Sequence, residues 1–298
     1  MGTVLEVAVV ADEEPRARQL AERCLFIAER WEGTLTTWRS DGELARLNAH
    51  AGKGPTTISP DLVYALQRML ALQQTTDNAF NPAVGSIVFA LRSGRPPPQT
   101  DRRAQELDDV LMLQNETAEL PDSVQLDAGG IGKGLALDAI DEMLRREKAD
   151  AWFLNFGGSS QLAHGRPPGE QWIVGIAGLK TGHAHGILVL RDASLSTSRS
   201  VPASEPSGTI VDPRTGGPVV PARSVTVLAP DATSADAWST ALIVLGREGV
   251  PAAHADGIEV LYEDAEGTVV TSAFPLERRV SAQTWPAIRP RSPHRPSD

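Results

Sequence analysis

Four short strand-like segments follow one another in the second half of the chain, and no helical pattern interrupts them. The stretches between them are rich in Gly, Pro and Ser, which is typical of turns. The segments lie at 152–156, 172–177, 186–190 and 224–229, and a later pair lies at 258–262 and 269–272. A doubly wound sheet needs alternating strands and helices, so this order argues against one. We therefore predict an α+β fold with mixed or antiparallel sheets and flanking helices.

Helical patterns flank these segments. Ser59, Pro60 and Asp61 supply an N-cap, a proline and an acidic residue to the first turn of a helix that runs to about residue 74. Ser40 and Glu43 fit a capping box for a shorter helix. Further helices are predicted at 15–31, 135–148 and 235–245, the last capped by Thr233 or Ser234 and ended by Gly246.

Composition narrows the classes of function. The chain has 298 residues and a net charge of −10, with no cluster of basic residues, so we predict no nucleic-acid partner. No stretch reaches the ~20 apolar residues of a membrane span, and the opening lacks the basic region of a signal peptide. We therefore predict a cytoplasmic protein with no membrane partner. A single cysteine, Cys24, excludes an internal disulfide, and its apolar-periodic surroundings predict a buried thiol.

The length fits one domain over residues 1–285, either undivided or in two packed lobes. The segment 286–298 is rich in Pro and Arg, so we predict a disordered tail there.

The densest chemical signal is the glycine-rich segment DAGGIGKG, at 127–134. It follows a predicted short strand that ends at Leu126 and precedes a predicted helix. Its four glycines let backbone N–H groups approach an anion, and Lys133 adds a positive charge. The spacing matches neither a P-loop nor a dinucleotide fingerprint. Taken alone, the segment is therefore also compatible with a plain glycine turn.

A second signal lies about a hundred residues further on. Asp236 and Thr240 are four residues apart on a predicted helix, so their side chains share one face. A carboxylate and a hydroxyl form a pair of hard oxygen ligands suited to Mg²⁺ or Ca²⁺. A surface aspartate beside a threonine in the helix interior is the alternative interpretation.

The order of the motifs is more specific than any one of them. DAGGIGKG, NFGG, SLSTS, IVDPRTG and SVTVLAPDATSADAWSTALIVLG follow one another as in the FAD:protein FMN transferase family, the ApbE-like flavin transferases. Earlier segments agree as well: the opening MGT, the stretch from Trp38 to Asn48, and Ala79-Phe80-Asn81-Pro82. The chain resembles a divergent member of this family over about residues 1–275, and the resemblance implies a T-fold-like architecture.

The resemblance also implies a reaction. Family members cleave the pyrophosphate of FAD, attach FMN to a Thr or Ser hydroxyl of an acceptor, and release AMP. By similarity, Asp236, Thr240 and the carbonyl of Gly130 would hold Mg²⁺, with Ca²⁺ or Mn²⁺ as alternatives, and Lys133 would position the phosphates. Catalytic roles would fall to Asp236, Lys133 and Thr209. The residues expected to contact FAD are Met1, Trp38, Ala79, Phe80, Asn81, Asp127, Gly129, Lys133, Thr197, Ser198 and Ile210.

Three positions depart from the family pattern. Thr209 stands where the family usually has a histidine, and a threonine cannot accept a proton at neutral pH. Asn81 replaces an aspartate, and Arg199 replaces a glycine. These departures leave two alternatives open: an FAD-binding protein without transfer activity, and a pyrophosphatase that converts FAD to FMN and AMP.

Overall fold

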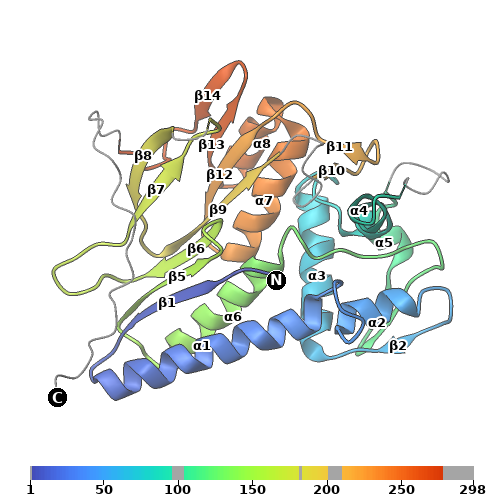
Figure 1. The fold of residues 1–298 in the computed structure, drawn as a ribbon, viewed down its shortest axis with the longest axis horizontal. Coiled ribbons are helices and arrows are strands. Elements are labelled where there is room, and N and C mark those ends of the chain that lie inside the picture. The colour runs from blue at the N-terminus through green and yellow to red at the C-terminus, as the bar shows by residue number, and fades with distance from the viewer. Residues whose placement is uncertain (1, 96–103, 181–182, 201–209, 278–298) are drawn as a thin grey trace.

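A seven-stranded antiparallel sheet and the helices packed on it form the larger of two regions of the molecule (Figure 1). The structure is a computed structural model, and it describes residues 2–95, 104–180, 183–200 and 210–277. The strand order is β1-β5-β6-β9-β12-β13-β14. The bounds are β1 (Leu5–Val10), β5 (Ala151–Phe156), β6 (Ser160–His164), β9 (Ala193–Arg199), β12 (Ser224–Ala229), β13 (Glu259–Asp264) and β14 (Gly267–Val270).

Helices cover one face of this sheet. They are α1 (Glu14–Leu35), α6 (Gly132–Arg146) and α7 (Ala232–Leu245), and α7 leads through the 3₁₀ turn η2 (Arg247–Gly249) into α8 (Val250–Ala255). Helix α6 lies between α1 and α7, and α7 packs on β9 and β12. The hairpin of β7 (Ile173–Ala177) and β8 (Ala184–Val189) lies on the other face, over a separate cluster that includes Leu188, Leu195 and Phe274. Alternate side chains of each strand therefore enter different cores.

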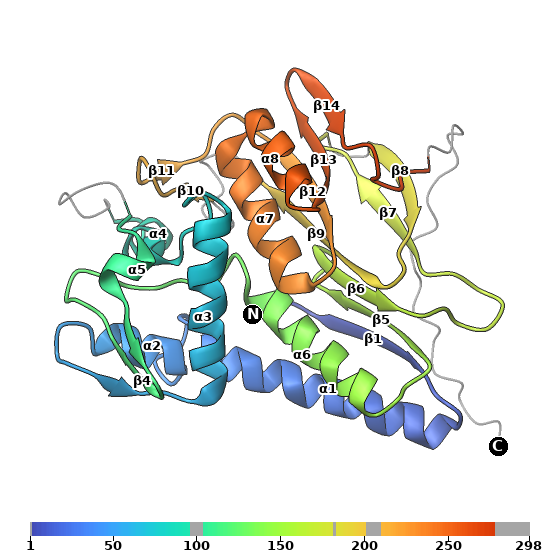
Figure 2. The ribbon, with the colours of Figure 1, turned by 180° about the vertical axis from the view of Figure 1, so that it is seen from behind.

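A smaller, mainly helical region lies beside the sheet layer (Figures 1 and 2). Its helices are α2 (Glu43–Ala49), α3 (Pro60–Thr75), η1 (Pro82–Val84), α4 (Gly85–Arg92) and α5 (Leu107–Val110). A three-stranded sheet in the order β2-β4-β3 supports them, with β2 (Thr56–Thr57), β3 (Met112–Gln114) and β4 (Thr117–Glu119). The short hairpin of β10 (Val211–Asp212) and β11 (Gly217–Pro218) lies near α4 in both views.

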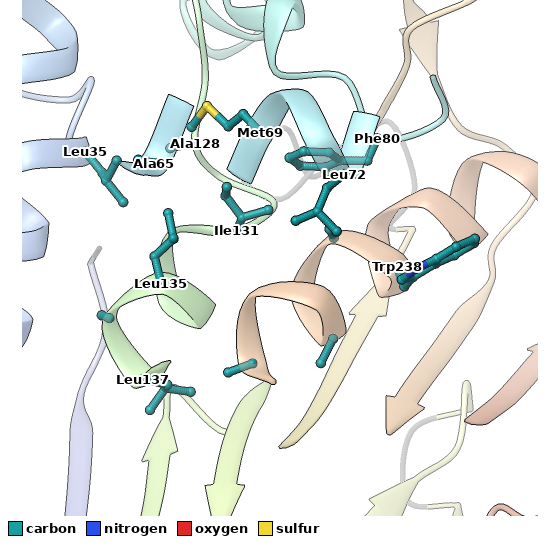
Figure 3. Packing of buried hydrophobic residues seen from close by; sticks show 14 of the residues in the cluster. Leu35, Ala65, Met69, Leu72, Phe80, Ala128, Ile131, Leu135, Leu137 and Trp238 are labelled. Atoms are coloured by element: carbon teal, nitrogen blue, oxygen red, sulfur yellow. The ribbon is translucent and has the colours of Figure 1, made fainter. Parts of the chain in front are cut away.

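One hydrophobic core joins the two regions (Figure 3). Met69 and Leu72 of α3 come from the helical region and face Ile131 and Leu135, at the start of α6. The glycine-rich segment thus crosses the boundary between the regions, and both regions fix its position. The predicted α+β fold with antiparallel sheets is confirmed. None of the helices in the described residues is both long and apolar enough to cross a membrane.

Two predictions next to the glycine-rich segment are wrong. No strand ends at Leu126. Instead, the side chain of Asn48 donates to the carbonyl of Leu126 and accepts from its N–H, both at 2.8 Å, so a side chain satisfies this backbone in place of a neighbouring strand. The helix predicted from residue 135 begins at Gly132. Lys133 therefore lies in the first helical turn and not in a loop.

The predicted caps had mixed outcomes. Ser59 caps α3 as expected, accepting from the N–H of Leu62 at 3.2 Å. The capping box at Ser40 is wrong: Gly42 precedes α2, and the carboxylate of Glu43 accepts from Ser59 instead, which ties α2 to α3.

The expected cap of α7 is also wrong. Asp231 caps this helix, accepting from the N–H of Ser234 at 2.8 Å. The predicted burial of Cys24 is confirmed, and burial raises the pKa of its thiol to about 12.

Candidate functional site

A cavity of about 360 Å³ opens where the glycine-rich segment meets α7, the end of β9 and the β10–β11 hairpin. We name it the hydroxyl pocket, because Thr197, Ser198 and Thr240 line it beside Lys133. Its other lining residues are Ala79, Phe80, Asn81, Val84, Val88, Asp127, Gly129, Gly130, Arg199, Ile210, Val211 and Pro213. Polar donors and two cationic residues, Lys133 and Arg199, thus line a space large enough for part of a nucleotide.

A second cavity of about 320 Å³ shares Asp127 with the first. We name it the aromatic pocket, because Trp38 and Phe89 line it with side chains that are 69% and 55% exposed. Its other lining residues are Thr37, Ala45, Asn48, Ala49, Gly85, Ser93, Gln125 and Leu126. Two cavities of different chemistry therefore meet at one carboxylate.

Most of the residues expected from the sequence lie together. The hydroxyl pocket contains Ala79, Phe80, Asn81, Asp127, Gly129, Gly130, Lys133, Thr197, Ser198, Ile210 and Thr240. Trp38 lies apart from them, in the aromatic pocket. Met1 and Thr209 lie outside the described residues. Asp236 is only 3% exposed and lies next to the start of α6.

The two oxygens of the Asp236 carboxylate have different partners. Oδ1 accepts from the hydroxyls of Ser160 at 2.7 Å and Ser196 at 2.6 Å. Oδ2 accepts from the backbone N–H of Gly134 at 2.8 Å and lies 4.0 Å from Nζ of Lys133. Oδ1 is therefore fully occupied inside the protein, while Oδ2 faces the positive charge at the start of α6.

Buried hydroxyls connect Asp236 to the pocket. Ser198 lines the pocket, and its Oγ is 2.7 Å from Oγ of Ser239, which is 3.2 Å from Oγ of Ser196. Ser196 donates to Asp236, and Ser239 donates to the backbone carbonyl of Asp236. Ser196 and Ser198 are two apart on β9, and Asp236 and Ser239 are three apart on α7, so the strand and helix repeats bring these groups together.

Glycine at 134 allows α6 and α7 to touch. A Cβ at this position would lie 2.4 Å from the carbonyl oxygen of Ala232 and 2.6 Å from Cα of Thr233. Any side chain here would push the helices apart. Because the helices are so close, the N–H of Gly134 reaches the carboxylate of Asp236 on α7. The N-cap residue of α6, Ile131, has no side-chain cap, so Asp236 caps α6 from the other helix.

The donor set at this place fits a hard divalent cation. A Cβ at Gly130 would lie 3.3 Å from Oγ1 of Thr240, so the backbone of the glycine-rich segment approaches that hydroxyl closely. Carboxylate, hydroxyl and carbonyl oxygens are the donors that Mg²⁺, Ca²⁺ and Mn²⁺ prefer. The described residues contain no group of three or more His, Cys, Asp or Glu side chains that could hold a metal. A cation here would therefore be held by hydroxyl and carbonyl oxygens beside the single carboxylate, with further oxygens from water or a bound phosphate.

Asn81 has a structural role in its own environment. It is 5% exposed; its amide nitrogen donates to Oδ1 of Asn78 at 2.8 Å and to the carbonyl of Gln105 at 3.0 Å, and its oxygen accepts from the N–H of Ala83. An aspartate could not donate these two bonds. The amide thus suits the bonds made at this position.

Sequence reasoning missed several residues of the site. Two serines around Asp236, at 160 and 239, were not singled out. Ser196 lies in the hydroxyl-rich stretch SLSTS, which the family resemblance places near the ligand, and it donates to Asp236. Asp138 was also missed: its carboxylate accepts from the N–H groups of Ala232 and Thr233 at 2.7 and 2.9 Å, and from the Thr233 hydroxyl at 2.5 Å.

Known proteins are similar to this chain in sequence and in fold. The profile of the ApbE family matches residues 1–262. A protein of Treponema pallidum named FAD:protein FMN transferase is 31% identical over 83% of this chain and 77% of its own length. This chain belongs to the ApbE family. A Klebsiella pneumoniae FAD:protein FMN transferase is similarly 29% identical over 77% of this chain and 76% of its own length. The expected family and the expected transferase class are confirmed.

Solved structures of ApbE proteins show the same fold. The ApbE protein of Thermotoga maritima superposes with a TM-score of 0.80 over 92% of this chain and 95% of that one, at 23% identity. The Pseudomonas stutzeri flavinyl transferase ApbE superposes with a TM-score of 0.78 over 91% of each chain, at 24% identity. This chain therefore has the fold of the ApbE proteins.

Proposed function

We propose that this chain is a divalent-metal-dependent transferase that cleaves the FAD pyrophosphate, attaches FMN to a Thr or Ser hydroxyl of an acceptor, and releases AMP. One observation carries the proposal: the glycine-rich segment and the face of α7 bearing Asp236 and Thr240 meet at the hydroxyl pocket. This contact brings an anion-binding helix start and a set of hard oxygen donors to one space.

In this proposal Asp236, Thr240 and the carbonyl of Gly130 hold the metal. When bound, the metal would neutralise charge on the diphosphate and on the departing AMP. Lys133 and the amides of the glycine-rich segment orient the phosphates, and Phe80 and Trp38 pack against the rings of FAD. The acceptor oxygen forms a bond to the phosphorus of the FMN half as the bond to the AMP oxygen breaks.

The hydroxyl proton must leave as the new ester forms. Among the described residues that line the hydroxyl pocket, Asp127 is the carboxylate of suitable chemistry to accept it, and its Oδ1 is held by the N–H of Gly129 at 2.8 Å. Replacing Asp127 with Asn would then lower the turnover rate more than it weakens FAD binding.

The test is incubation of the chain with FAD, Mg²⁺ and an acceptor polypeptide rich in Thr and Ser. We expect AMP in solution and covalent flavin fluorescence on the acceptor, both lost with EDTA. AMP together with free FMN and an unlabelled acceptor would indicate a pyrophosphatase. FAD binding without AMP, under any of Mg²⁺, Mn²⁺ and Ca²⁺, would indicate a binding protein.

The proposed acceptor is a protein, as the names of the relatives state for their own reactions. A small molecule with a free hydroxyl is the other acceptor class compatible with this chemistry. Supplying each class separately in the same assay distinguishes the two. We place the reaction in the cytoplasm.

A further inference from the structure

Helices α6 and α7 cap each other. Asp138 of α6 accepts three hydrogen bonds from the first turn of α7: the N–H groups of Ala232 and Thr233, and the Thr233 hydroxyl. Asp236 of α7 accepts the N–H of Gly134, in the first turn of α6. Each helix thus uses a carboxylate to accept hydrogen bonds from the free N–H groups at the start of the other helix. Asp138 lies four residues after Gly134 in α6, and Asp236 lies four residues after Ala232 in α7.

The Asp138 bonds have no competitor among the described residues. Arg68 of α3, which lines the same cleft, donates to Asp231 at 2.9 Å and to Ser234 at 3.2 Å, and not to Asp138. Burial raises the pKa of Asp138 to about 6, and the hydrogen bond from Thr233 is the largest of the effects that oppose this rise. A half-buried carboxylate whose partners all come from one helix terminus ties its own helix to that terminus.

The two caps lie at the same place, where the first turns of α6 and α7 pack against each other; we call this contact the helix crossing. Gly134 donates to Asp236, and a Cβ at Gly134 would meet the backbone of Ala232 and Thr233, the residues that Asp138 holds. The metal-binding groups proposed above are divided between the two helices: Gly130 and Lys133 lie at the start of α6, and Asp236 and Thr240 lie on α7. A change in the crossing would therefore change the distances across the candidate site.

We propose that Asp138 is a positioning residue, which holds the first turn of α7 on α6 and so sets the separation of the Gly130 and Lys133 side of the site from Asp236 and Thr240. Its role toward the metal rests on the proposed function, whereas its role in the crossing does not. Asp138 itself lines a different cleft, beside Tyr64 and Arg68, and is not among the residues lining the hydroxyl pocket.

The first experiment measures the crossing without any ligand. Hydrogen exchange at the Gly134 amide is followed by NMR in the wild type, in Asp138→Asn and in Glu142→Gln. Glu142 lies on the same helix and lines the same cleft, but it accepts a hydrogen bond from the exposed Arg146, also on α6, which makes it a matched control. We expect exchange at Gly134 to accelerate at least about tenfold in Asp138→Asn and to stay within about twofold in the control.

The second experiment measures the consequence for the site. In the AMP-release assay, Asp138→Asn should raise the Mg²⁺ concentration for half-maximal rate by about fivefold or more, with the FAD half-saturation and the rate at saturating Mg²⁺ changed less than twofold. Thr233→Val removes one of the three bonds while keeping the shape of the side chain, and should give an intermediate shift. This milder variant keeps the test decisive if Asp138→Asn does not fold.

The outcomes separate the two proposals. If Asp138→Asn and Thr233→Val accelerate exchange only at Ala232 and Thr233 and leave Gly134 protected, Asp138 is a local cap and the positioning role is wrong. An unchanged Mg²⁺ half-saturation would also overturn it. If the wild type releases no AMP with any metal, the proposed function fails, and exchange at Gly134 still decides whether Asp138 sets the crossing.

Discussion

The hydroxyl pocket and the aromatic pocket share Asp127 but are built in different ways. Behind the hydroxyl pocket, Asp236 is buried with Ser196 and Ser239, and each of these side chains is hydrogen-bonded within the protein. The aromatic pocket presents Trp38 and Phe89, which are mostly exposed. Substitutions in the first pocket should therefore disturb both the fold and the chemistry, whereas substitutions in the second should disturb ligand binding alone.

The largest effect is expected from removing the buried negative charge of Asp236, behind the hydroxyl pocket. Asp236→Asn keeps the shape of the side chain but loses one carboxylate oxygen and the negative charge opposite Lys133. We expect AMP release at saturating Mg²⁺ to fall at least about a hundredfold, since a preorganised charged group is being removed. Glu142→Gln should leave the rate unchanged. A rate above one tenth of the wild-type value would remove Asp236 from the proposed metal site.

A smaller effect is expected from a methyl group at the helix crossing. Gly134→Ala would place Cβ 2.4 Å from a backbone oxygen, and such overpacking typically costs about 1–3 kcal/mol of unfolding free energy. The control is Gly33→Ala in α1, where a new Cβ has no neighbour within 4 Å, and this change should stabilise by about 0.5–1 kcal/mol. Urea unfolding measures both. Equal stabilities for the two variants would contradict the close crossing.

In the aromatic pocket the expected effect is on affinity alone. Trp38→Ala should raise the FAD concentration for half-maximal rate by about 5–30-fold, which corresponds to roughly 1–2 kcal/mol of lost ring packing. Its unfolding free energy should change by less than about 0.5 kcal/mol, because the side chain is 69% exposed. Phe26→Ala, a similarly exposed aromatic on α1, should change neither quantity. An unchanged FAD half-saturation in Trp38→Ala would show that no ring of FAD packs against Trp38.

The pH dependence of the unfolding free energy tests the environment of Asp138, which lies outside both pockets. The pKa of Asp138 is about 6 in the folded protein against its ordinary value of 3.8, so the folded state binds this proton more tightly than the unfolded chain does. Between about pH 6 and pH 4, the unfolding free energy of the wild type relative to Asp138→Asn should therefore rise as pH falls, by at most about 1.4 kcal/mol per pH unit. The facing groups that also titrate or carry charge are Tyr64, Arg68, Asp141, Glu142, Arg145, Asp192 and Asp231.

Urea titrations of both proteins at several pH values provide the measurement. The groups that face Asp138 are common to the two proteins, so their contributions largely cancel in the difference. A difference that falls as the pH is lowered would contradict the raised pKa.

Much of this arrangement could be predicted from local sequence. The Ser-Pro-Asp start of α3 and the strand at 224–229 follow from residue preferences that act within a few positions, and both appear in the structure. The strand predicted to end at Leu126 does not exist, because Asn48, 78 residues away, takes up the backbone bonds. Likewise, α6 begins before its predicted start because Asp236 supplies the cap that its own sequence lacks.

For the candidate site, the order of the motifs along the chain predicted more than the residue spacing within any one motif. The motifs indicated which residues to expect, and eleven of them line one cavity. The supporting contacts, from Asp138 to Ala232 and from Asp236 to Ser160, join segments that are 94 and 76 residues apart. No periodicity within one element encodes such pairs, so a single sequence could not reveal them.

The bond between Gly134 and Asp236 spans 102 residues of chain. During synthesis, the glycine-rich segment leaves the ribosome long before its carboxylate partner exists. A nascent chain that ends before α7 therefore carries the anion-binding half of the site without Asp236 and Thr240. The candidate site is completed only when α7 is in place, so binding of FAD would report that most of the chain has folded.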